Sequence, residues 1–285
     1  MAARNFVLPE GSDGIRLDQA LARHIDELSR RTAKIALDVG CVFVNKKRVK
    51  TASKKLHAGD HVLANLDGPF QRAVDGQPEP AASLVATPIF EDAHLVVVEK
   101  PAGLLTAPTP EGDRNNVQHQ LAADPRRGRV LAVHRLDLQT SGILIFAKTA
   151  RANRTLSETF RKHDIVRRYD AFVLGEVQFD TKKVDVPVGG KSATTHFALI
   201  ERHPSFSWLE AQLETGRTHQ IRLHARSLGH EVLSDPNCGR RLDWGPPRLA
   251  LHAKHLALAH PITGARLEFS APLPADLEAW LAAVR

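Results

Sequence analysis

Cysteine is scarce in this sequence, which has only Cys41 and Cys238 among 285 residues. The two lie far apart and fit no paired spacing of metal ligands, so we expect isolated thiols in a reducing compartment. The first residues lack the continuous apolar segment of a secretory signal. No apolar run approaches the roughly 18 residues that a membrane-spanning helix needs. These absences favour a soluble cytoplasmic protein that contacts no membrane, and we expect a monomer.

Sequence motifs for cofactors and metals are also lacking. There is no Walker A loop, no dinucleotide-binding glycine pattern and no G-x-S-x-G elbow. His219 and His224 are five positions apart, and no acidic or cysteine ligand completes a metal set around them. His252 and His255 lie in an alternating, strand-like segment, where they should face opposite sides. We therefore expect neither a metal nor a cofactor.

Positive charge is what the sequence has in excess. The formal net charge is +7, which favours a polyanionic partner. Apolar residues make up 42% of the chain and charged residues 25%, which is ordinary globular usage, so a sizeable core can form. At roughly 100–200 residues per domain, the length allows one large domain with a small one, or two medium ones.

The composition changes along the chain at two places. Residues 66–83 are rich in Gly, Pro, Ala and polar residues and have no hydrophobic period, which indicates a linker. Before them the chain is short-period and basic, and after them apolar runs alternate with helical stretches. We therefore predict a small N-terminal domain over 1–65, a linker over 66–83 and a larger domain over 84–285.

The N-terminal block predicts two helices followed by short strands. RLDQALARHI places Leu17, Leu21 and Ile25 on one helical stripe. Ser29 can cap a second helix, which Gly40 ends. CVFVNKKRVK indicates a hairpin that turns at residues 45–46, and AGDHVLANL indicates a further strand.

Most of the excess charge lies in this block, where residues 15–65 hold eleven Lys/Arg against five Asp/Glu. A charged helix face is usually only solvated, and that alternative applies to each side chain taken singly. Clustering of one sign at a helix start and a hairpin suits a phosphate backbone instead. The candidate RNA contacts are Arg16, Arg30, Arg31, Lys34, Lys46, Lys47 and Arg48.

The order of these segments resembles the alpha-L RNA-binding domain, first named from a small-subunit ribosomal protein. The resemblance covers about fifty residues. It implies binding of structured RNA, because a small basic module contacts shape and phosphates more than sequence.

The larger block predicts an α+β fold. Strand-like runs such as GILIFAK, RRYDAFVLGEV, TTHFALIER and FSWLEAQLE outnumber helical stretches and often follow one another directly. We therefore expect a mixed, largely antiparallel sheet with flanking helices.

The densest polar segment is VHRLDLQTSGILIF at 133–146, where Thr140, Ser141 and Gly142 predict a tight turn before a strand. This arrangement places Asp137 in a loop at the sheet edge, where catalytic groups are often found. Arg135 is two residues away and could hold that carboxylate ionised and oriented. The alternative is a structural Arg–Asp pair that secures the loop.

Two further segments carry candidate residues. Tyr169, the only tyrosine, begins a strand after Arg167 and Arg168, so it can stack on a base while the arginines hold phosphates; the alternative is a half-buried packing residue. In LETGRTHQIRLHARSLG, a predicted helix places Arg217, Ile221 and His224 on one stripe and Thr218 and Arg222 on the adjacent face. Arg222 could then reach a carboxylate or a phosphate.

These stretches together resemble the RluA-type family of pseudouridine synthases. The matching segments are EKPAG (99–103), HRLDLQTSGILIFAKT (134–149), RRYDAFVLG (167–175), LETGRTHQIRLH (213–224) and RLALHAKHLALAHPITG (248–264), in the family's order. The resemblance implies that Asp137 is the essential carboxylate, Tyr169 stacks on a flipped uracil, Arg222 pairs with Asp137, and Leu251 lines the base pocket. His134 and Arg135 would border the same site.

One departure from the family's pattern follows SLGHEVLSDP, where a Tyr-Gly pair is usual and this chain has Asn237, Cys238 and Gly239. The family's reaction needs no cofactor, and the substrate it implies is structured RNA, with large-subunit ribosomal RNA favoured by the N-terminal domain. Two alternatives stay open at this point: a synthase directed at tRNA, and a non-catalytic RNA-binding or ribosome-assembly protein.

Overall fold

The computed structural model describes residues 3–76, 84–110, 112, 114–238 and 242–285. The chain divides into two compact units: unit 1 comprises the described residues within 1–83 and 107–119, and unit 2 those within 84–106 and 120–285. Residues 107–119, which the sequence pattern assigned to the larger block, therefore cluster with the N-terminal residues. None of the helices in the described ranges is long and apolar enough to cross a membrane.

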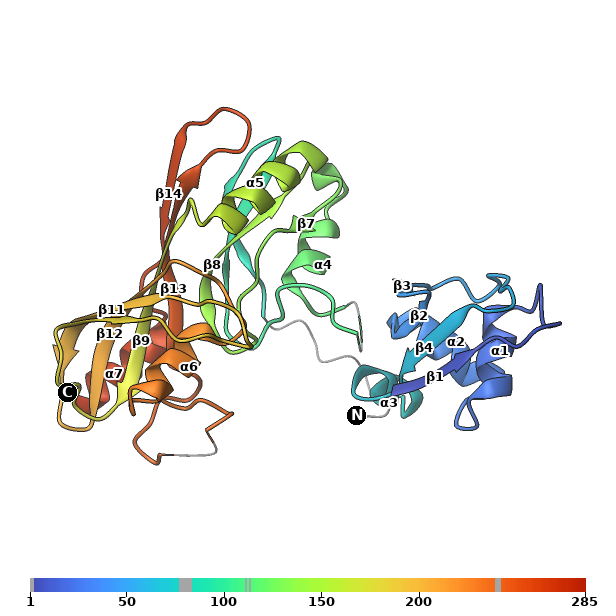
Figure 1. The fold of residues 1–285 in the computed structure, drawn as a ribbon, viewed down its shortest axis with the longest axis horizontal. Helices are drawn as coiled ribbons and strands as arrows, with labels where there is room; N and C mark the ends of the chain where they lie inside the picture. Colours follow the sequence, from blue (N-terminus) through green and yellow to red (C-terminus); the bar gives the residue numbers. More distant parts are fainter. Residues whose placement is uncertain (1–2, 77–83, 111, 113, 239–241) are drawn as a thin grey trace. The chain divides into compact units, whose positions relative to one another are not determined.

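Unit 1 is a four-stranded sheet with helices (Figure 1). Its strand order is β1-β4-β2-β3, and all of its neighbouring strands run antiparallel. The elements are β1 (Ala3–Val7), α1 (Leu17–His24), α2 (Arg30–Val39), β2 (Val42–Val44), β3 (Lys47–Arg48), β4 (His61–Asn65) and α3 (Pro69–Val74).

The local sequence signals of unit 1 act as expected. Ser29 caps α2 by accepting a hydrogen bond from the Thr32 N–H at 3.2 Å, and Gly40 ends the helix with φ +81°. Asn45 and Lys46 both have positive φ in the turn between β2 and β3. The predicted linker at 66–83 is not free of regular structure, since α3 lies within it. Phe70 of α3 is 5% exposed and packs into the core of unit 1, which stabilises the helix. Residues 77–83 lie outside the described residues.

Unit 2 is a large mixed sheet with flanking helices, as predicted. Its path is β10-β11-β12-β9-β13-β8-β6-β5, with β14 beside β13 and β7 beside β8. The strands are β5 (Thr87–Glu91), β6 (Leu95–Lys100), β7 (Leu131–Ala132), β8 (Ser141–Ala147), β9 (Val166–Leu174), β10 (Thr181–Val184), β11 (Thr195–Arg202), β12 (Phe206–Leu213), β13 (Leu251–Ala259) and β14 (Arg266–Ser270). The helices are α5 (Ala150–Lys162), α6 (Gln220–Ser227), α7 (Ala275–Val284), the 3-10 turn Pro125–Arg127, and α4 (Val117–Ala122), which begins in unit 1.

One strand pair in the centre of this sheet is parallel. Ser141 and Gly142 of β8 pair with His252 and Ala253 of β13, and the other neighbouring strands in the described part of the sheet are antiparallel. Gly142 has φ +115°, and a Cβ there would lie 2.3 Å from the Ala253 carbonyl oxygen. Glycine is therefore required where these two strands meet.

Helices cover different parts of the sheet (Figure 1). Leu156 of α5 packs with Ile143 of β8 in one apolar cluster. Trp280 of α7 stacks edge-on against Phe172 of β9, with ring centroids 5.2 Å apart. Side chains alternate along a strand, so Tyr169 of β9 faces away from the side that carries Phe172.

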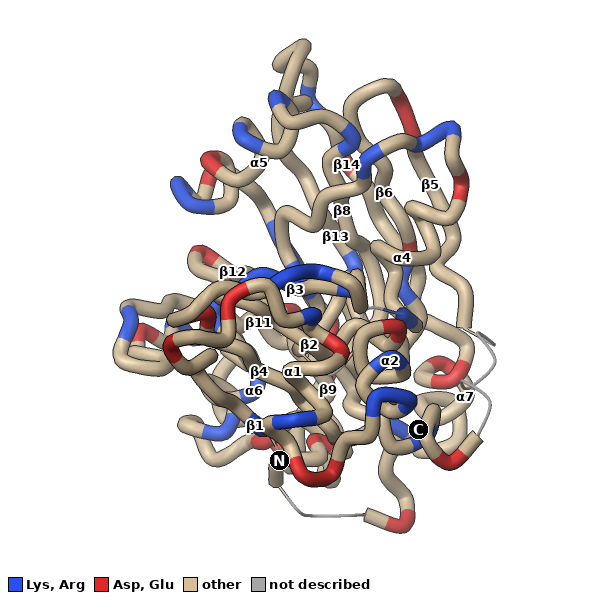
Figure 2. Tube along the Cα trace, turned by 90° about the vertical axis from the view of Figure 1, so that its right-hand side faces the viewer, with Lys and Arg blue, Asp and Glu red and all other residues tan. Residues whose placement is uncertain are grey.

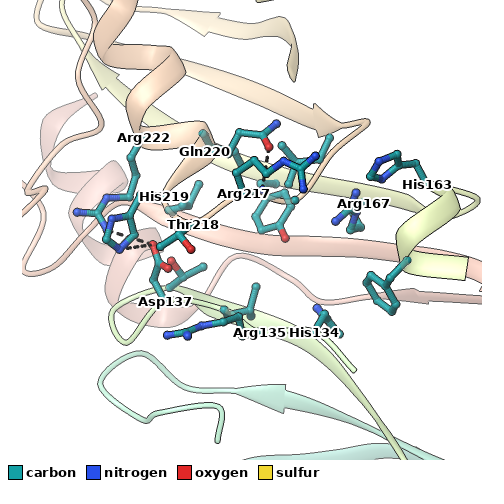
Figure 3. Close-up of a pocket in the computed structure, with 18 of the residues that line it drawn as sticks. His134, Arg135, Asp137, His163, Arg167, Arg217, Thr218, His219, Gln220 and Arg222 are labelled. Carbon is teal, nitrogen blue, oxygen red and sulfur yellow. Dashed lines mark hydrogen bonds and ion pairs between the residues drawn. The ribbon is translucent and has the colours of Figure 1, made fainter. Parts of the chain in front are cut away.

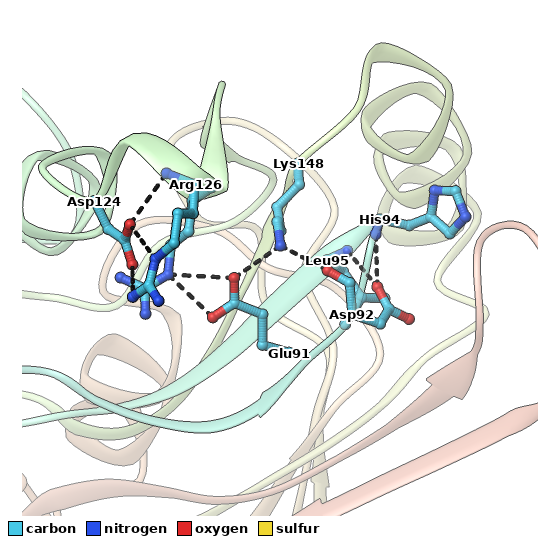
Figure 4. A network of polar contacts seen from close by, with 8 residues as sticks. Glu91, Asp92, His94, Leu95, Asp124, Arg126 and Lys148 are labelled. Carbon is cyan, nitrogen blue, oxygen red and sulfur yellow. Dashed lines mark hydrogen bonds and ion pairs between the residues drawn. The ribbon is translucent and has the colours of Figure 1, made fainter.

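The turn between β5 and β6 is held by a polar network (Figure 4). Asp92 accepts hydrogen bonds from the N–H groups of His94 and Leu95, at 2.6 and 2.8 Å. Glu91 pairs with Lys148, which follows β8, at 2.7 Å. The turn between β5 and β6 is thus fastened to the end of β8.

Candidate active site

A cavity of about 500 Å³ lies in unit 2. It is lined by the loop before β8, the end of α5, strand β9, and the connection from β12 to α6 (Figure 3). Leu251, the first residue of β13, also contributes to the wall. Because β8, β13 and β9 are neighbours in the sheet, they bring segments that are distant in sequence to one place.

Asp137 faces this cavity from the loop between β7 and β8. Its Oδ2 accepts a hydrogen bond from Arg222 Nη1 at 3.1 Å, and His219 Nε2 lies 3.7 Å from the same oxygen (Figure 3). The Asp137 side chain is 20% exposed and that of Arg222 only 6%. A carboxylate that ligands can reach is therefore oriented by a buried guanidinium.

Arg222 is shared between two carboxylates. Its Nε donates to Asp235 Oδ2 at 2.7 Å, and its Nη2 donates to Asp235 Oδ1, a bidentate pair that fixes the plane of the guanidinium. Burial lowers the pKa of Arg222, but the hydrogen bonds that it donates to Asp235 and Asp137 outweigh this effect, so the pKa lies above its ordinary value. Arg222 stays charged and fixed in one orientation.

Asp235 and His219 were not predicted from the sequence. Asp235 is buried and lies in a loop thirteen positions after Arg222. The Ser-Asp-Pro triplet at 234–236 was its one available signal, and nothing in that triplet indicates which side chain it meets. His219 has φ +57° immediately before α6, a conformation that the expected helix would not have allowed.

The start of α6 corrects one prediction. The helix begins at Gln220, so Arg217 and Thr218 are not on a helical stripe. Gln220 causes this: its Oε1 accepts hydrogen bonds from Thr215 Oγ1 at 2.7 Å and from the Arg217 N–H at 2.9 Å, which holds the preceding residues in a loop. Arg222 nevertheless reaches a carboxylate, as its position suggested.

Arg135 makes no ion pair with Asp137 within the part of the chain that the structure describes. It is an exposed residue of the cavity lining. The local Arg–Asp pair that the spacing also allowed is therefore absent, and Arg222 takes its place from 85 residues away. The expected turn also differs slightly, since Ser141 and Gly142 already belong to β8.

Tyr169 and Leu251 form an apolar part of the lining. They are 8% and 4% exposed, respectively. Burial raises the pKa of the Tyr169 hydroxyl, and the negative charge of Asp137 acts in the same direction. Tyr169 is thus both a packed residue and a wall of the cavity, so its two sequence interpretations are compatible.

The two arginines before Tyr169 face different sides. Arg167 is 6% exposed and lines the cavity, where its Nη2 donates to the Glu214 carbonyl at 3.2 Å. Its Nε is buried and has no hydrogen-bond partner among the described residues. Arg168 is exposed and lies 3.8 Å from Glu210. Alternation along β9 therefore gives only Arg167 to the site.

His134 borders the cavity in a neutral form. Its Nε2 accepts a hydrogen bond from the Ile145 N–H at 3.1 Å, and its ring stacks on Phe160 with centroids 4.6 Å apart. Burial, together with the positive charge of Arg167, lowers its pKa to about 3. A proton on Nε2 would destroy that hydrogen bond. The hydrogen bond and the lowered pKa therefore both indicate a neutral ring.

Lys100 is a buried amine beside the Asp137 loop. It is 0% exposed, and its Nζ donates to the carbonyls of Leu104 at 2.7 Å, Pro101 at 2.9 Å and Leu138 at 3.1 Å. Burial lowers its pKa to about 7, with the positive charge of Arg248 acting the same way. Because Leu138 directly follows Asp137, Lys100 positions the loop that carries the carboxylate.

The seven basic residues that the sequence singled out as RNA contacts fall into two groups. Arg16 and Arg30 both pair with Asp18, at 3.0 and 3.6 Å, and Arg48 donates to the carbonyls of Gly40 and Thr109. The others are exposed and make no ion pair with the described residues, and Figure 2 shows Lys and Arg along α2 and β3, where they lie. These four are Arg31, Lys34, Lys46 and Lys47.

Two family models match this sequence. The one described as RNA pseudouridylate synthase covers residues 94–227, which include the cavity's carboxylate and arginine. The S4 domain model covers residues 15–62, most of unit 1 before α3. Both resemblances drawn from the sequence are thereby confirmed.

Similar proteins extend over nearly the whole chain. A protein of Nitrosomonas europaea named ribosomal large subunit pseudouridine synthase D is 36% identical over 321 residues, covering 98% of this chain and 87% of its own. A protein of the same name from Zymomonas mobilis is 35% identical, covering 98% of this chain and 96% of its own. Among solved structures, human RNA pseudouridylate synthase domain containing 4 has a TM-score of 0.59 at 22% identity, over 70% of this chain and 92% of its own, which shows a shared fold.

Proposed function

Because this chain belongs to the RNA pseudouridylate synthase family, and is therefore an isomerase, we propose that it converts uridines of large-subunit ribosomal RNA with Asp137 as its catalytic carboxylate. The choice of RNA rests on the Nitrosomonas and Zymomonas relatives, whose names state that target. We further propose that the protein acts as a monomer in the cytoplasm.

The reaction is an isomerisation. The bond between uracil N1 and ribose C1′ breaks, the uracil turns, and a bond forms between C5 and C1′. The hydrogen displaced from C5 leaves as a proton, and N1 ends protonated. Nothing is oxidised and no group is imported. The chemistry therefore needs a uracil held in position and a carboxylate rather than a cofactor.

The observation that carries this proposal is the placement of Asp137, oriented by Arg222 at a cavity that Tyr169 and Leu251 line. A target base must leave its stack to reach such a cavity, which costs a few kcal/mol. Stacking on an aromatic ring offsets roughly 1–3 kcal/mol of that cost. Tyr169 and Leu251 would hold the uracil, with Arg135 and His134 at the border.

Asp137 has three chemically sound roles as a carboxylate. It can attack the ribose at C1′, attack the uracil ring, or remove the C2′ proton. Each role requires a carboxylate held in place, and Arg222 Nη1 donates a hydrogen bond to it at 3.1 Å. The buried pair with Asp235 keeps Arg222 from turning away.

The test of the catalytic assignment is Asp137→Asn in an assay of tritium release from RNA that contains 5-tritiated uridine. We expect release by the wild-type protein and none by the variant, with RNA affinity nearly unchanged. Asp180→Asn, at a side chain that is 86% exposed, is the matched control and should behave like wild type. Wild-type turnover by Asp137→Asn would refute the assignment.

The RNA target is tested by mapping pseudouridines across all cellular RNA with and without this protein. Loss of sites in large-subunit ribosomal RNA is the expected result. Loss of sites in tRNA instead would identify a tRNA-directed synthase. An unchanged map, with no tritium release by the purified protein, would favour a non-catalytic RNA-binding or ribosome-assembly protein.

A further inference from the structure

A second groove, of about 540 Å³, adjoins the cavity on unit 2. It runs along α5, where Arg154 and Arg161 are seven residues apart on one face, a distance of about 10 Å at 1.5 Å per residue. Arg129, from the segment before β7, faces the same groove. Arg161 lines both the groove and the cavity, so the two are neighbours on the surface of unit 2.

The groove carries unbalanced positive charge. Its charged residues are Arg129, Arg154 and Arg161 against the single Glu158, and none of the three arginines is ion-paired to another described residue. All three are exposed. Asn153 and Ser157, on the same helical face, add neutral hydrogen-bonding groups.

The positive field continues where the groove meets the cavity. Arg167 and Arg217 line the cavity there, together with His163 at the end of α5. Burial lowers the pKa of His163, and the positive charges of Arg167 and Arg217 lower it further. The buried Nε of Arg167 has no hydrogen-bond partner in the described ranges. Cations thus extend from the mouth of the cavity along α5.

We propose that this groove, which we call the α5 groove (Arg129, Arg154 and Arg161), binds the RNA backbone on one side of the target uridine. The inference rests on the proposed function, since a uridine placed in the cavity brings its flanking phosphates to the cavity mouth. A row of arginines without ion-pair partners in the described structure suits successive phosphates, which attract several cations at once. The contact positions the strand and does not select its sequence.

The test compares two double variants that remove the same charge from the same protein. Arg129→Gln with Arg154→Gln alters the groove beyond the cavity. Arg151→Gln with Lys162→Gln alters exposed residues of α5 that line neither the groove nor the cavity. Single-turnover tritium release, with protein in excess over an RNA transcript that the wild type modifies, gives a half-saturating concentration and a maximal rate for each.

The groove variant should raise the half-saturating protein concentration about tenfold and leave the maximal rate unchanged. Its slope of log affinity against log salt should fall by about 1.4, since each phosphate contact to a single strand contributes about 0.7. The control variant should change both quantities far less. Equal effects of the two variants would mean a diffuse attraction to positive charge and would overturn the proposal.

Shortened transcripts test the side of the strand. Trimming the RNA from one end towards the target should weaken binding to the wild type, and the groove variant should no longer respond to that trimming. A groove variant that responds to trimming at both ends as the wild type does would also overturn the proposal. Tritium release by the wild type separates this test from the test of the proposed function. If the wild type releases no tritium, the proposed function is wrong. If it does release tritium, the variants and the shortened transcripts test the α5 groove alone.

Discussion

Tyr169 offers the cavity both a ring and a hydroxyl, and Tyr169→Phe separates them. The ring stays, so stacking on a uracil and the packing of β9 are kept. The hydroxyl, which lies in a buried site near the charge of Asp137, is lost. We expect the maximal rate of tritium release to fall far more than RNA affinity. Equal losses of rate and affinity would show that Tyr169 only packs; Tyr169→Leu, which removes the ring, should lower both.

His134 makes the stability of unit 2 depend on pH. Its pKa is lowered from 6.5 to about 3. Between these pH values the unfolded chain binds a proton at His134 and the folded chain does not. Its stabilising contribution is complete above pH 6.5 and is lost as the pH falls towards 3, by up to about 1.4 kcal/mol per pH unit.

His134→Gln removes this titration and keeps a hydrogen-bond acceptor for the Ile145 N–H. Between pH 6.5 and 5, we expect the free energy of unfolding to fall less steeply for the variant than for the wild type. Urea unfolding followed by tryptophan fluorescence is the measurement, because all three tryptophans lie in unit 2. Parallel pH profiles of the two proteins would contradict the assignment of a neutral His134 in the folded protein.

Asp137, Tyr169 and Arg222 could be singled out from the sequence because each stands in a distinctive segment, and the structure brings all three to one cavity. Asp235 was not, because its role exists only through a contact with Arg222 that a loop creates. Lys100 was visible as part of EKPAG, but its three carbonyl partners depend on how two loops fold together. A residue whose role depends on a partner that only the fold brings close has no distinctive local sequence pattern.

At the scale of elements, β8 and β13 meet so closely that position 142 has no room for a side chain. Gly142→Ala would push a Cβ to 2.3 Å from a backbone oxygen and impose positive φ on alanine. We expect a loss of about 3 kcal/mol or more in the free energy of unfolding, and loss of activity, because the Asp137 loop leads directly into β8.

Gly175→Ala is the control for this variant. Gly175 also has positive φ, but the nearest neighbour of an added Cβ would be 3.8 Å away. It should cost about 1 kcal/mol. Similar urea midpoints for the two variants would count against this account.

Elements with strong local signals were predicted well. Helix α2 has a serine cap and a glycine end, and most strands of unit 2 are apolar runs bounded by turn residues. Helix α3 was missed because its Pro- and Gly-rich surroundings resemble a linker, and the burial of Phe70 decides otherwise. Strand β10 was missed because three of its four residues are exposed, so it lacks an apolar period.

At the scale of the molecule, the excess charge of unit 1 should control how RNA binding responds to salt. Neutralising Arg31, Lys34, Lys46 and Lys47 with glutamine removes four exposed cations that make no ion pair in the described structure. We expect weaker RNA binding and a flatter dependence on salt, by about 0.7–0.9 in slope for each phosphate that the variant no longer binds. The maximal single-turnover rate should stay at its wild-type value.

The comparison for this variant is Lys182→Gln with Lys183→Gln, which changes exposed residues of β10 in unit 2. Filter binding at several salt concentrations gives the two slopes. A quadruple variant with the wild-type slope would show that this surface of unit 1 is only solvated.

Unit 1 is assembled from two stretches of chain that are not adjacent in sequence. Arg48 donates a hydrogen bond to the Thr109 carbonyl, and Asn65 donates one to the Pro110 carbonyl. Residues near 110 are therefore part of the folded unit that residues 3–76 form. During synthesis these partners emerge only after β5 and β6 have been made. The small unit therefore cannot finish folding before part of the large one has left the ribosome, and a cut after residue 83 would separate it from its own last segment.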